Sequence, residues 1–384
     1  MQRSKIQQVF DLGWQDYLET FSPSPVQFRT ACSILGCKSP SMGCSISSCQ
    51  DCGHVSIHYN SCRNRNCPNC QAVLKEVWID ARKAEVIDAP YFHVVFTLPA
   101  ELNPLIYANQ ELLYSLMHTC SAHTLLECSQ NPRFLGATPG IIQVLHTWGQ
   151  ELNFHPHIHC IVSGAGLTKD LKLKKCGRHF FLPAKALARK FRGKFLAALS
   201  DAFEKGLLVF SHSCGQLRNS FRFRELLDKL YNIQWCPDIR ETFNGFGNAL
   251  EYLGRYTHRI AITNTRIQSV SKEAVTFTAR DYRNNSALKT VCVTPQEFIR
   301  RLMMHVLPAG FQKIRYYGFL NNRYKQQNLQ IIFNIQGHQQ FHAMLMGLSM
   351  AEILKQVWGC DTSICPVCGH SSMRPAGRTF SMRN

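Results

Sequence analysis

The stretch His155-Pro156-His157-Ile158-His159 decides the predicted fold. Successive side chains of a β-strand point to opposite faces, so His157 and His159 would share one face while Ile158 packs on the other. A preceding strand is predicted from Ile141 to Trp148, and a turn at Gly149 would join the two strands in an antiparallel hairpin. Two imidazoles on one strand face are typical of a divalent metal site, although a cross-strand histidine pair without metal is the alternative.

A third ligand for this metal would have to come from elsewhere in the chain. His146 and Gln150 lie on or just after the preceding strand, and His258 lies about a hundred residues later. The sequence leaves all three open.

A second motif, Tyr252-Leu253-Gly254-Arg255-Tyr256-Thr257-His258-Arg259, is predicted to be helical. Residues four apart share one face of a helix, so Tyr252 and Tyr256 would lie together. A simple packing pair is the common explanation of such spacing, but Arg255 and Arg259 favour a phosphate-lined cleft. A phenol with a pKa near ~10 is a poor nucleophile at neutral pH, and it can attack a phosphodiester when a metal ion polarises the phosphate. The pattern therefore indicates an enzyme that cuts DNA through a phosphotyrosine.

The charge of the chain points to a polyanionic partner. It has 43 Lys and Arg against 25 Asp and Glu, a net charge of +18 and a pI near 9.3. Basic side chains that neutralise phosphates release counterions and gain affinity for nucleic acid. A solvated basic surface or an anionic membrane is the alternative. No apolar run approaches the ~18 residues that would span a bilayer, and the polar start resembles no secretion signal. We expect a soluble, cytoplasmic protein with no membrane partner.

Eighteen cysteines, several in Cys-x-x-Cys pairs, are typical of metal thiolates. Two such pairs separated by fourteen residues predict one tetrahedral, structural zinc site with the ligands Cys49, Cys52, Cys67 and Cys70. Cys62 and Cys44 could replace a ligand or help to bind a second ion. Arg63 and Arg65, between the pairs, suit phosphate contacts.

A third pair, Cys365 and Cys368, gives a weaker indication of a second zinc ion because it is a single knuckle. Cys360 and His370 could complete it. The zinc nucleobase deaminase pattern is excluded, because no His-x-Glu precedes these knuckles.

The organisation of the chain follows from these motifs. We predict N-terminal helices and a zinc-binding domain over 1–88, a catalytic domain over 89–320 with a basic helical insertion at 170–230, and a C-terminal tail over 321–384. Helices are predicted at 104–129, 184–204, 221–230 and 295–305, strands at 91–98 and 238–243, and a three-stranded meander at 260–294.

Together these motifs resemble the two-tyrosine rolling-circle transposases of bacterial insertion sequences, within the His-hydrophobic-His (HUH) endonuclease superfamily. The resemblance covers roughly residues 40–320. Besides the histidine and tyrosine motifs it rests on 59–70, 91–99, 146–149, His305-Val306-Leu307-Pro308-Ala309-Gly310-Phe311 and Arg315-Tyr316-Tyr317-Gly318. Cys44 departs from the family, which often has histidine there.

The resemblance implies an α+β fold: an antiparallel ferredoxin-like sheet with flanking helices, and a small N-terminal Cys-rich zinc domain. It implies that His157 and His159 hold Mg²⁺ or Mn²⁺. It also implies that Tyr252 and Tyr256 attack single-stranded DNA at transposon ends, forming 5′-phosphotyrosines and releasing 3′-hydroxyls for rolling-circle, one-ended transposition.

Two other functions are compatible with the same residues. A plasmid or phage replication initiator would use the same chemistry at an origin, and a zinc-dependent DNA-binding protein would carry an inactive nuclease core. The N-terminal thiols and the motifs after the tyrosines favour the transposase.

Overall fold

The computed structural model describes most of the chain. The described residues are 3–177, 182–235, 237–242, 260–281, 285–337 and 341–380, with the side chains of 212 and 240–242 left aside.

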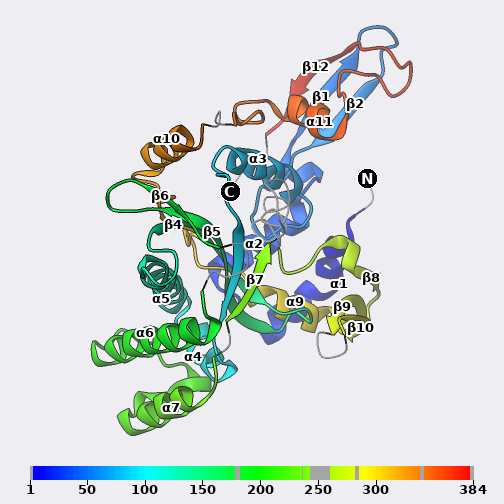
Figure 1. Cartoon of the computed structure of the whole chain (residues 1–384). Helices are drawn as coiled ribbons and strands as arrows, with labels where there is room; N and C mark the ends of the chain where they lie inside the picture. Colours follow the sequence, from blue (N-terminus) through cyan, green and yellow to red (C-terminus); the bar gives the residue numbers. More distant parts are fainter. Residues whose placement is uncertain are drawn as a thin grey trace.

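An antiparallel sheet forms the centre of the molecule (Figure 1). Its main strands are β3 (Tyr91–Thr97), β4 (Thr138–Trp148), β5 (Phe154–Leu167), β7 (Asp238–Thr242) and β11 (Ile314–Gly318). They lie in the order β11-β4-β5-β3-β7, and the short β6 (Leu173–Lys175) pairs with the end of β5. Every pairing in this sheet is antiparallel.

The connections between these strands are helical. Between β3 and β4 run α4 (Asn103–Ala108) and α5 (Gln110–Gln130), and between β5 and β7 run α6 (Ala184–Glu204) and α7 (Ser220–Asn232). The order β-α-β-β-α-β, with the first and third strands central, is a ferredoxin-like arrangement to which β11 adds an edge strand. The predicted α+β fold class is confirmed.

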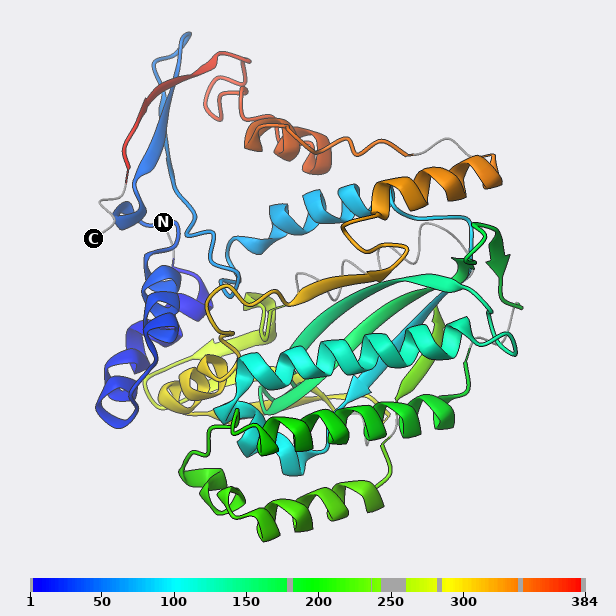
Figure 2. The same ribbon diagram turned by 90° about the vertical axis from the view of Figure 1, so that its left-hand side faces the viewer.

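One face of the sheet packs on α5 and α6, which lie side by side beneath it in Figure 2. Alternate residues of each strand point this way, including Phe96 and Ile158, and they meet Phe191 and Phe195 of α6. Each side chain of this size stabilises the fold by roughly 1.5–3 kcal/mol when fully buried. The hairpin predicted from the histidine stretch is therefore anchored by a full core.

The opposite face is covered only in part by helices. α10 (Lys325–Gln336) packs Ile332 and Phe333 on Ile142 and Ile161 at one end of the strands. α3 (Gln71–Lys83) lies beside α10 above the sheet (Figure 2) and contacts Tyr316 of β11. His157 and His159 lie on this second face, nearer the start of β5 than Ile161.

A second core joins the N-terminal helices to the predicted meander. α1 (Lys5–Thr20) and α2 (Pro25–Gly36) pack on α9 (Pro295–Met303) and on the sheet of β8 (Ile267–Val270), β9 (Val275–Asp281) and β10 (Ala287–Val293). Gly13 permits the close contact of α1 with α9, because a Cβ there would come within 2.7 Å of Pro295. The meander and the helix predicted at 295–305 are confirmed.

A third sheet combines the two ends of the chain. β12 (Met373–Arg378) pairs with β1 (Cys44–Cys49), which pairs with β2 (Val55–Tyr59), and α11 (Met350–Trp358) precedes β12. Figure 1 shows β12 beside the N-terminal hairpin. Strand periodicity could not predict this pairing, because it links residues more than three hundred positions apart. The domain limits 1–88, 89–320 and 321–384 stay a prediction.

Four short 3₁₀ turns complete the described structure: η1 (Pro40–Met42), η2 (Ala100–Leu102), η3 (His212–Arg218) and η4 (Asn264–Arg266). No helix within the described ranges is long and apolar enough to cross a lipid bilayer.

Candidate metal centres and catalytic face

Three histidines meet on the second face of the central sheet. The register of β4 and β5 sets His146 opposite His157, and His159 lies two residues farther along β5. One ring nitrogen from each lies within 4.8 Å of the others. Of the two third-ligand candidates that the structure describes, His146 and Gln150, His146 is the one brought to this cluster. The Gln150 side chain instead accepts a hydrogen bond from the Arg280 amide at 3.4 Å.

Neighbouring groups orient two of these imidazoles. His157 Nδ1 lies 2.7 Å from the carbonyl oxygen of His155, and a carbonyl can only accept, so this nitrogen carries the proton. His159 Nδ1 lies 2.8 Å from Nε2 of His93, a buried residue of β3. In both rings Nε2 is then the nitrogen that could face a metal ion, as is usual for histidine ligands with a fixed second nitrogen.

His93 was missed by the sequence analysis, although its strand was predicted. The strand register sets His93 opposite Ile161, diagonal to His159 on the same face. Only this register brings the two rings together, and the sequence does not fix it.

The donor set suits a divalent ion with open positions. Imidazole is a borderline ligand, and Mg²⁺ or Mn²⁺ would need oxygen ligands from phosphate and water besides. The indole of Trp148 stacks on the His146 ring with centroids 4.5 Å apart, and so limits the movement of that ring.

The predicted nucleophiles Tyr252 and Tyr256 lie outside the described residues, as do Arg255, His258 and Arg259. The residues that flank this segment are described. β7 follows β3 as far as the pair Thr242 and Tyr91, and Ile260 lines the same hollow as Trp148. The two flanks thus lie at opposite ends of the strand face that carries the histidines.

The cysteines form two clusters, neither of which is the predicted one. The first consists of Cys37, Cys62, Cys67 and Cys70, and the second of Cys49, Cys52, Cys365 and Cys368. The structure does not bring Cys49 and Cys52 together with Cys67 and Cys70, because the first pair lies at the turn between β1 and β2 and the second pair directly precedes α3.

The remaining cysteine candidates have different positions. Cys62, named as a replacement ligand, belongs to the first cluster. Cys44 belongs to neither, and its Sγ lies 3.3 Å from the Thr379 hydroxyl. Cys360 is exposed and is also outside both. His370 does not complete a knuckle with it; its Nδ1 lies 3.0 Å from the Asp51 carboxylate.

The first cluster has the dimensions of a tetrathiolate zinc site. Cys62 Sγ and Cys70 Sγ lie 3.7 Å apart. Four sulfurs at ~2.3 Å from one zinc ion would be about 3.8 Å apart, whereas a disulfide requires ~2.05 Å. Hydrogen bonds among the thiols hold the pKa of Cys37 below its usual range and raise that of Cys67. The pKa values of these two thiols are thus shifted in opposite directions. A bound cation would remove this difference, because all four sulfurs can then be thiolates.

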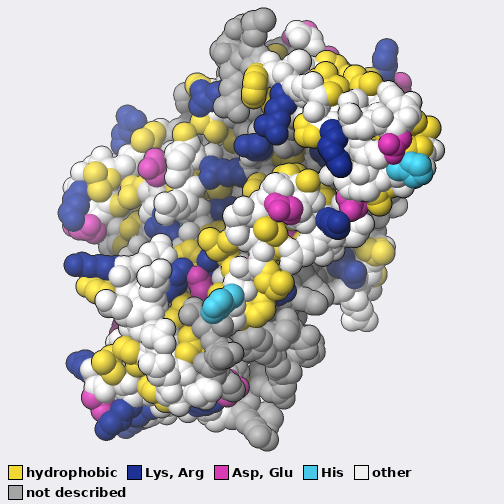
Figure 3. Space-filling view, turned by 90° about the horizontal axis from the view of Figure 1, so that it is seen from above, with side chains coloured by type: hydrophobic (Ala, Val, Ile, Leu, Met, Phe, Trp, Pro, Cys, Tyr) yellow, Lys and Arg dark blue, Asp and Glu magenta, His cyan; other side chains and the backbone are white. Residues whose placement is uncertain are grey.

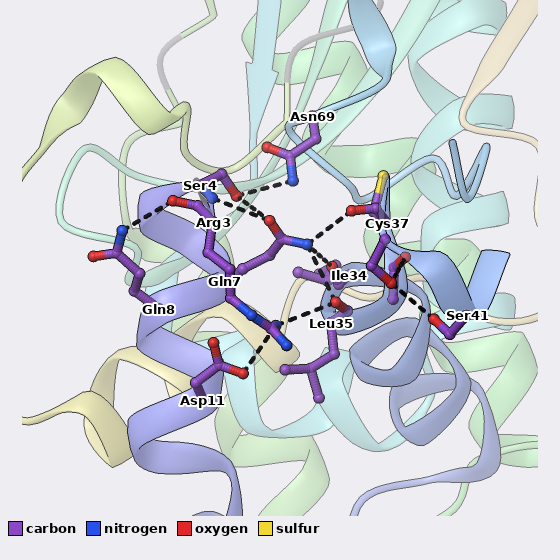
Figure 4. A network of polar contacts seen from close by, with 12 residues as sticks. Arg3, Ser4, Gln7, Gln8, Asp11, Ile34, Leu35, Cys37, Ser41 and Asn69 are labelled. Atoms are coloured by element: carbon purple, nitrogen blue, oxygen red, sulfur yellow. Dashed lines mark hydrogen bonds and ion pairs between the residues drawn. The ribbon is translucent and has the colours of Figure 1, made fainter. Parts of the chain in front are cut away.

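The N-terminal helix fixes the cluster from both sides (Figure 4). Gln7 of α1 donates from Nε2 to the carbonyl oxygens of Ile34, Leu35 and Cys37, the last at 2.8 Å. Asn69 donates to the Ser4 hydroxyl at 2.9 Å. Cys37 was missed because it has no Cys-x-x-Cys partner, and its burial at the end of α2 is a tertiary feature.

Known proteins match this chain over the segment that carries the first thiol cluster and over the segment that carries the three histidines. Residues 9–98 match a family model described as "Transposase zinc-binding domain", and residues 140–328 match one described as "Putative transposase". Transposase y4qJ of Sinorhizobium fredii, described as putative in its name, is 43% identical over 309 residues, which are 80% of this chain and 78% of that protein. The chain belongs to this transposase family. The transposase for insertion sequence element IS801 of Pseudomonas savastanoi pv. phaseolicola is 27% identical over 93% of this chain and 85% of its own length. No solved structure matches.

DNA is therefore the partner of this transposase, and the surface charge of the protein agrees with DNA binding. Figure 3 shows Lys and Arg side chains spread over the upper face, where Asp and Glu are sparser. The net charge of +18 favours contact with a polyanion.

The two arginines predicted to contact DNA differ in their surroundings. Arg63 of the transposase is exposed. Arg65 donates to the carbonyl oxygens of Leu307, Pro308 and Phe311, at 2.6 to 3.2 Å, and burial lowers its pKa. Arg65 thus joins the loop of the first thiol cluster to the segment after α9, a structural contact that its sequence position did not reveal.

Proposed function

We propose that this transposase nicks and rejoins single-stranded DNA at the ends of its element through 5′-phosphotyrosine intermediates, and so drives rolling-circle transposition. The observation that carries the proposal is the cluster of His146, His157 and His159 on a sheet face flanked by the two ends of the tyrosine segment.

In the proposed reaction the phenolic oxygen of Tyr252 or Tyr256 attacks the scissile phosphorus. A new O–P bond forms, the bond from phosphorus to the 3′ oxygen breaks, and that oxygen leaves as a hydroxyl after it takes up a proton. A Mg²⁺ or Mn²⁺ ion held by the three histidines would polarise the phosphate. His93 and the His155 carbonyl keep two of the ligand rings in position.

The phosphotyrosine keeps the energy of the phosphodiester, so a 3′-hydroxyl can later attack it and rejoin the strand. Two tyrosines permit two successive transfers without release of the DNA end. Such an enzyme works on the chromosome, and we propose that it associates with the nucleoid.

We also propose a structural zinc ion on Cys37, Cys62, Cys67 and Cys70. The match to a transposase zinc-binding domain and the sulfur spacing support this assignment. Four thiolates leave no open position on the ion, so its role is to order the segment before α3.

The test is covalent adduct formation. Full-length protein is incubated with 5′- and 3′-labelled single-stranded oligonucleotides from the element ends and Mn²⁺, and adducts are resolved on a denaturing gel. The double variant Tyr252→Phe/Tyr256→Phe should form no adduct and should bind DNA as the wild type does. Tyr231→Phe, which changes an exposed tyrosine of α7, is the control. An adduct that survives the double substitution would reject these nucleophiles.

The same assay separates the other functions. Binding without any adduct would favour a DNA-binding protein with an inactive core. A replication initiator would cleave an origin and spare the element ends, and the matches to transposases favour the reverse.

A further inference from the structure

The second thiol cluster is built from two copies of one short motif. Residues 49–54 and 365–370 both have the pattern Cys-x-x-Cys-Gly-His, and the two copies lie near opposite ends of the chain. The transposase zinc-binding domain match covers the first copy and ends long before the second.

The two copies also share one backbone conformation. In each, the amide of the first cysteine donates to the histidine carbonyl, at 2.8 Å in both copies. The glycine amide donates back to the first cysteine's carbonyl, at 3.1 Å in the first copy and 2.9 Å in the second. Gly53 and Gly369 have φ of 73° and 77°, a left-handed conformation that favours glycine. These turns are zinc knuckles in geometry as well as in sequence.

The knuckles face each other. Cys49 Sγ lies 3.6 Å from Cys368 Sγ, and Cys52 Sγ lies 3.6 Å from Cys365 Sγ. These separations suit the edges of a zinc tetrathiolate and are far too long for disulfides.

Little else holds this region together. Its buried apolar cluster consists of Met373 and the cysteines themselves. A core of that size cannot offset the conformational entropy of ordering three strands. The cross-links between the knuckles are polar: the Gln50 amide donates to the Ser372 carbonyl at 3.0 Å, and Asp51 accepts from the Ser372 hydroxyl.

We propose that Cys49, Cys52, Cys365 and Cys368 bind a second zinc ion that fastens the C-terminal strand β12 to the N-terminal hairpin. This centre is structural, because four thiolates fill the coordination sphere. Its ligands come equally from the two ends of the chain, so neither end can form it alone.

Metal content tests the proposal. Full-length protein purified with zinc should lose one equivalent, by elemental analysis and native mass spectrometry, on the double substitution Cys365→Ser/Cys368→Ser. Cys44→Ser and Cys360→Ser, which change cysteines outside both clusters, should lose none. Equal zinc content in wild type and double variant would overturn the proposal. Zinc held at the histidines would contribute equally to both and cancel.

A second measurement tests the proposal even if the double variant Cys365→Ser/Cys368→Ser misfolds. Co²⁺ substitution of the wild type should give tetrathiolate absorbance for two sites, and Cys52→Ser alone should halve it while the far-ultraviolet circular dichroism stays the same. Absorbance for one site in the wild type would also overturn the proposal.

A second, independent feature is a hollow beside the histidine cluster, lined by Trp148, which stacks on His146. The hollow is small, with a volume of about 20 Å³, and Arg65, Asn66, Trp148, His305 and Lys313 are among its lining residues. Most of the remaining lining residues are apolar, among them Ile34 of α2 and Leu302 of α9.

Lys313 is an unusual residue to find there. Burial, with a smaller effect of the Arg65 charge, lowers its pKa to about 8. No carboxylate is among the described residues that line the hollow. The Lys313 side chain is half-buried, and a cation partly withdrawn from water is stabilised when an anion pairs with it. His305 cannot add charge at neutral pH, because burial lowers its pKa to about 4.

We infer that a backbone phosphate next to the scissile phosphate binds at Lys313, beside the hollow, and that the adjoining base lies outside it against Trp148. The inference rests on the proposed function, since it assumes a single strand lying across the histidines. Aromatic rings that stack on bases are a usual feature of single-strand binding.

The salt dependence of binding tests this subsite. For a single-stranded oligonucleotide, the slope of log Kd against log salt should fall by about 0.7 in Lys313→Gln, as for the loss of one phosphate contact. Lys169→Gln, at an exposed turn, is the matched control for a general loss of charge. Thermal unfolding checks the fold, and Lys313→Arg should restore the slope.

An unchanged slope in Lys313→Gln would overturn the subsite even if the wild type forms the phosphotyrosine adduct. Failure of the wild type to form any adduct would reject the proposed reaction and leave the slope measurement intact. The two ideas can therefore fail separately.

Discussion

The histidine cluster and the second thiol cluster both gather metal ligands, but different forces hold them in place. Behind the histidines, the side chains of β3, β4 and β5 pack into a large core with α5 and α6. Around the thiols, Met373 is the one buried apolar side chain besides the cysteines in the described structure. The sheet would hold its histidines without a metal ion, whereas the region around the second thiol cluster depends on its ion to fold. This difference can be tested.

The largest expected effect is on catalysis. His157→Ala should lower the rate of adduct formation by at least about a hundredfold, because a metal ligand is lost. The unfolding temperature should change little, since Ile158 and its neighbours still pack on α5 and α6. Adduct kinetics and thermal unfolding measure the two effects, with His123→Ala on the exposed side of α5 as the control. A large loss of thermal stability would show that the histidine face also depends on its metal.

Chelation should have a large but local effect on structure. Removal of zinc should expose the amides of β1, β2 and β12 to hydrogen exchange, because metal binding there is part of folding. Amides of β4 and β5 should keep their protection. Exchange measured by mass spectrometry with and without chelator compares the two regions in one sample. Equal loss of protection in both would contradict the comparison.

A smaller effect is expected from His93, which positions a ligand. His93→Ala should weaken Mn²⁺ binding about 10- to 100-fold, since His159 loses the partner of its Nδ1. His93→Gln should restore part of the affinity, because the amide oxygen can accept a hydrogen bond from Nδ1. Titration calorimetry with Mn²⁺ gives the affinities. An equal loss of Mn²⁺ affinity in both variants would indicate that the volume of the His93 ring, rather than its hydrogen bond, positions His159.

The smallest effect concerns the core beneath the sheet. Burial lowers the pKa of His118 to about 3, from an ordinary value near 6.5. The unfolded chain therefore binds a proton that the folded chain does not, and the free energy of unfolding should fall as the pH drops below about 6.5. One such group contributes at most about 1.4 kcal/mol per pH unit. Urea unfolding from pH 7 to pH 5 measures the slope, and His118→Gln should reduce it; an unchanged slope would assign the pH dependence to other groups.

The parts of the molecule that could be predicted are those with a local signal. Alternation along His157-Ile158-His159 gave the strand and its buried side, and the amphipathic pattern gave the helix 184–204, which is α6. The helix predicted at 104–129 is interrupted at Asn109, a detail set by the contact of its side chain with Val209.

The thiol partners could not be predicted from adjacency. Cys49 and Cys67 lie close in sequence, yet their clusters are completed by Cys368 and Cys37, which only the tertiary fold brings near. The shared Cys-x-x-Cys-Gly-His pattern was the one available signal for the second cluster. No comparable signal existed for Cys37 or for His93, whose partners depend on helix packing and strand register.

The second thiol cluster takes its two knuckles from opposite ends of the chain, and this has a consequence for synthesis on the ribosome. Cys365 leaves the ribosome 313 residues after Cys52. At ordinary elongation rates of about 5 to 20 residues per second, this delay is roughly 15 to 60 s. During that time the early hairpin would have half of its ligands and no third strand. A nascent or prematurely terminated chain would then carry reactive thiols and an unpaired strand edge, the features that attract proteases and chaperones. Only a molecule translated beyond its second knuckle would escape that surveillance.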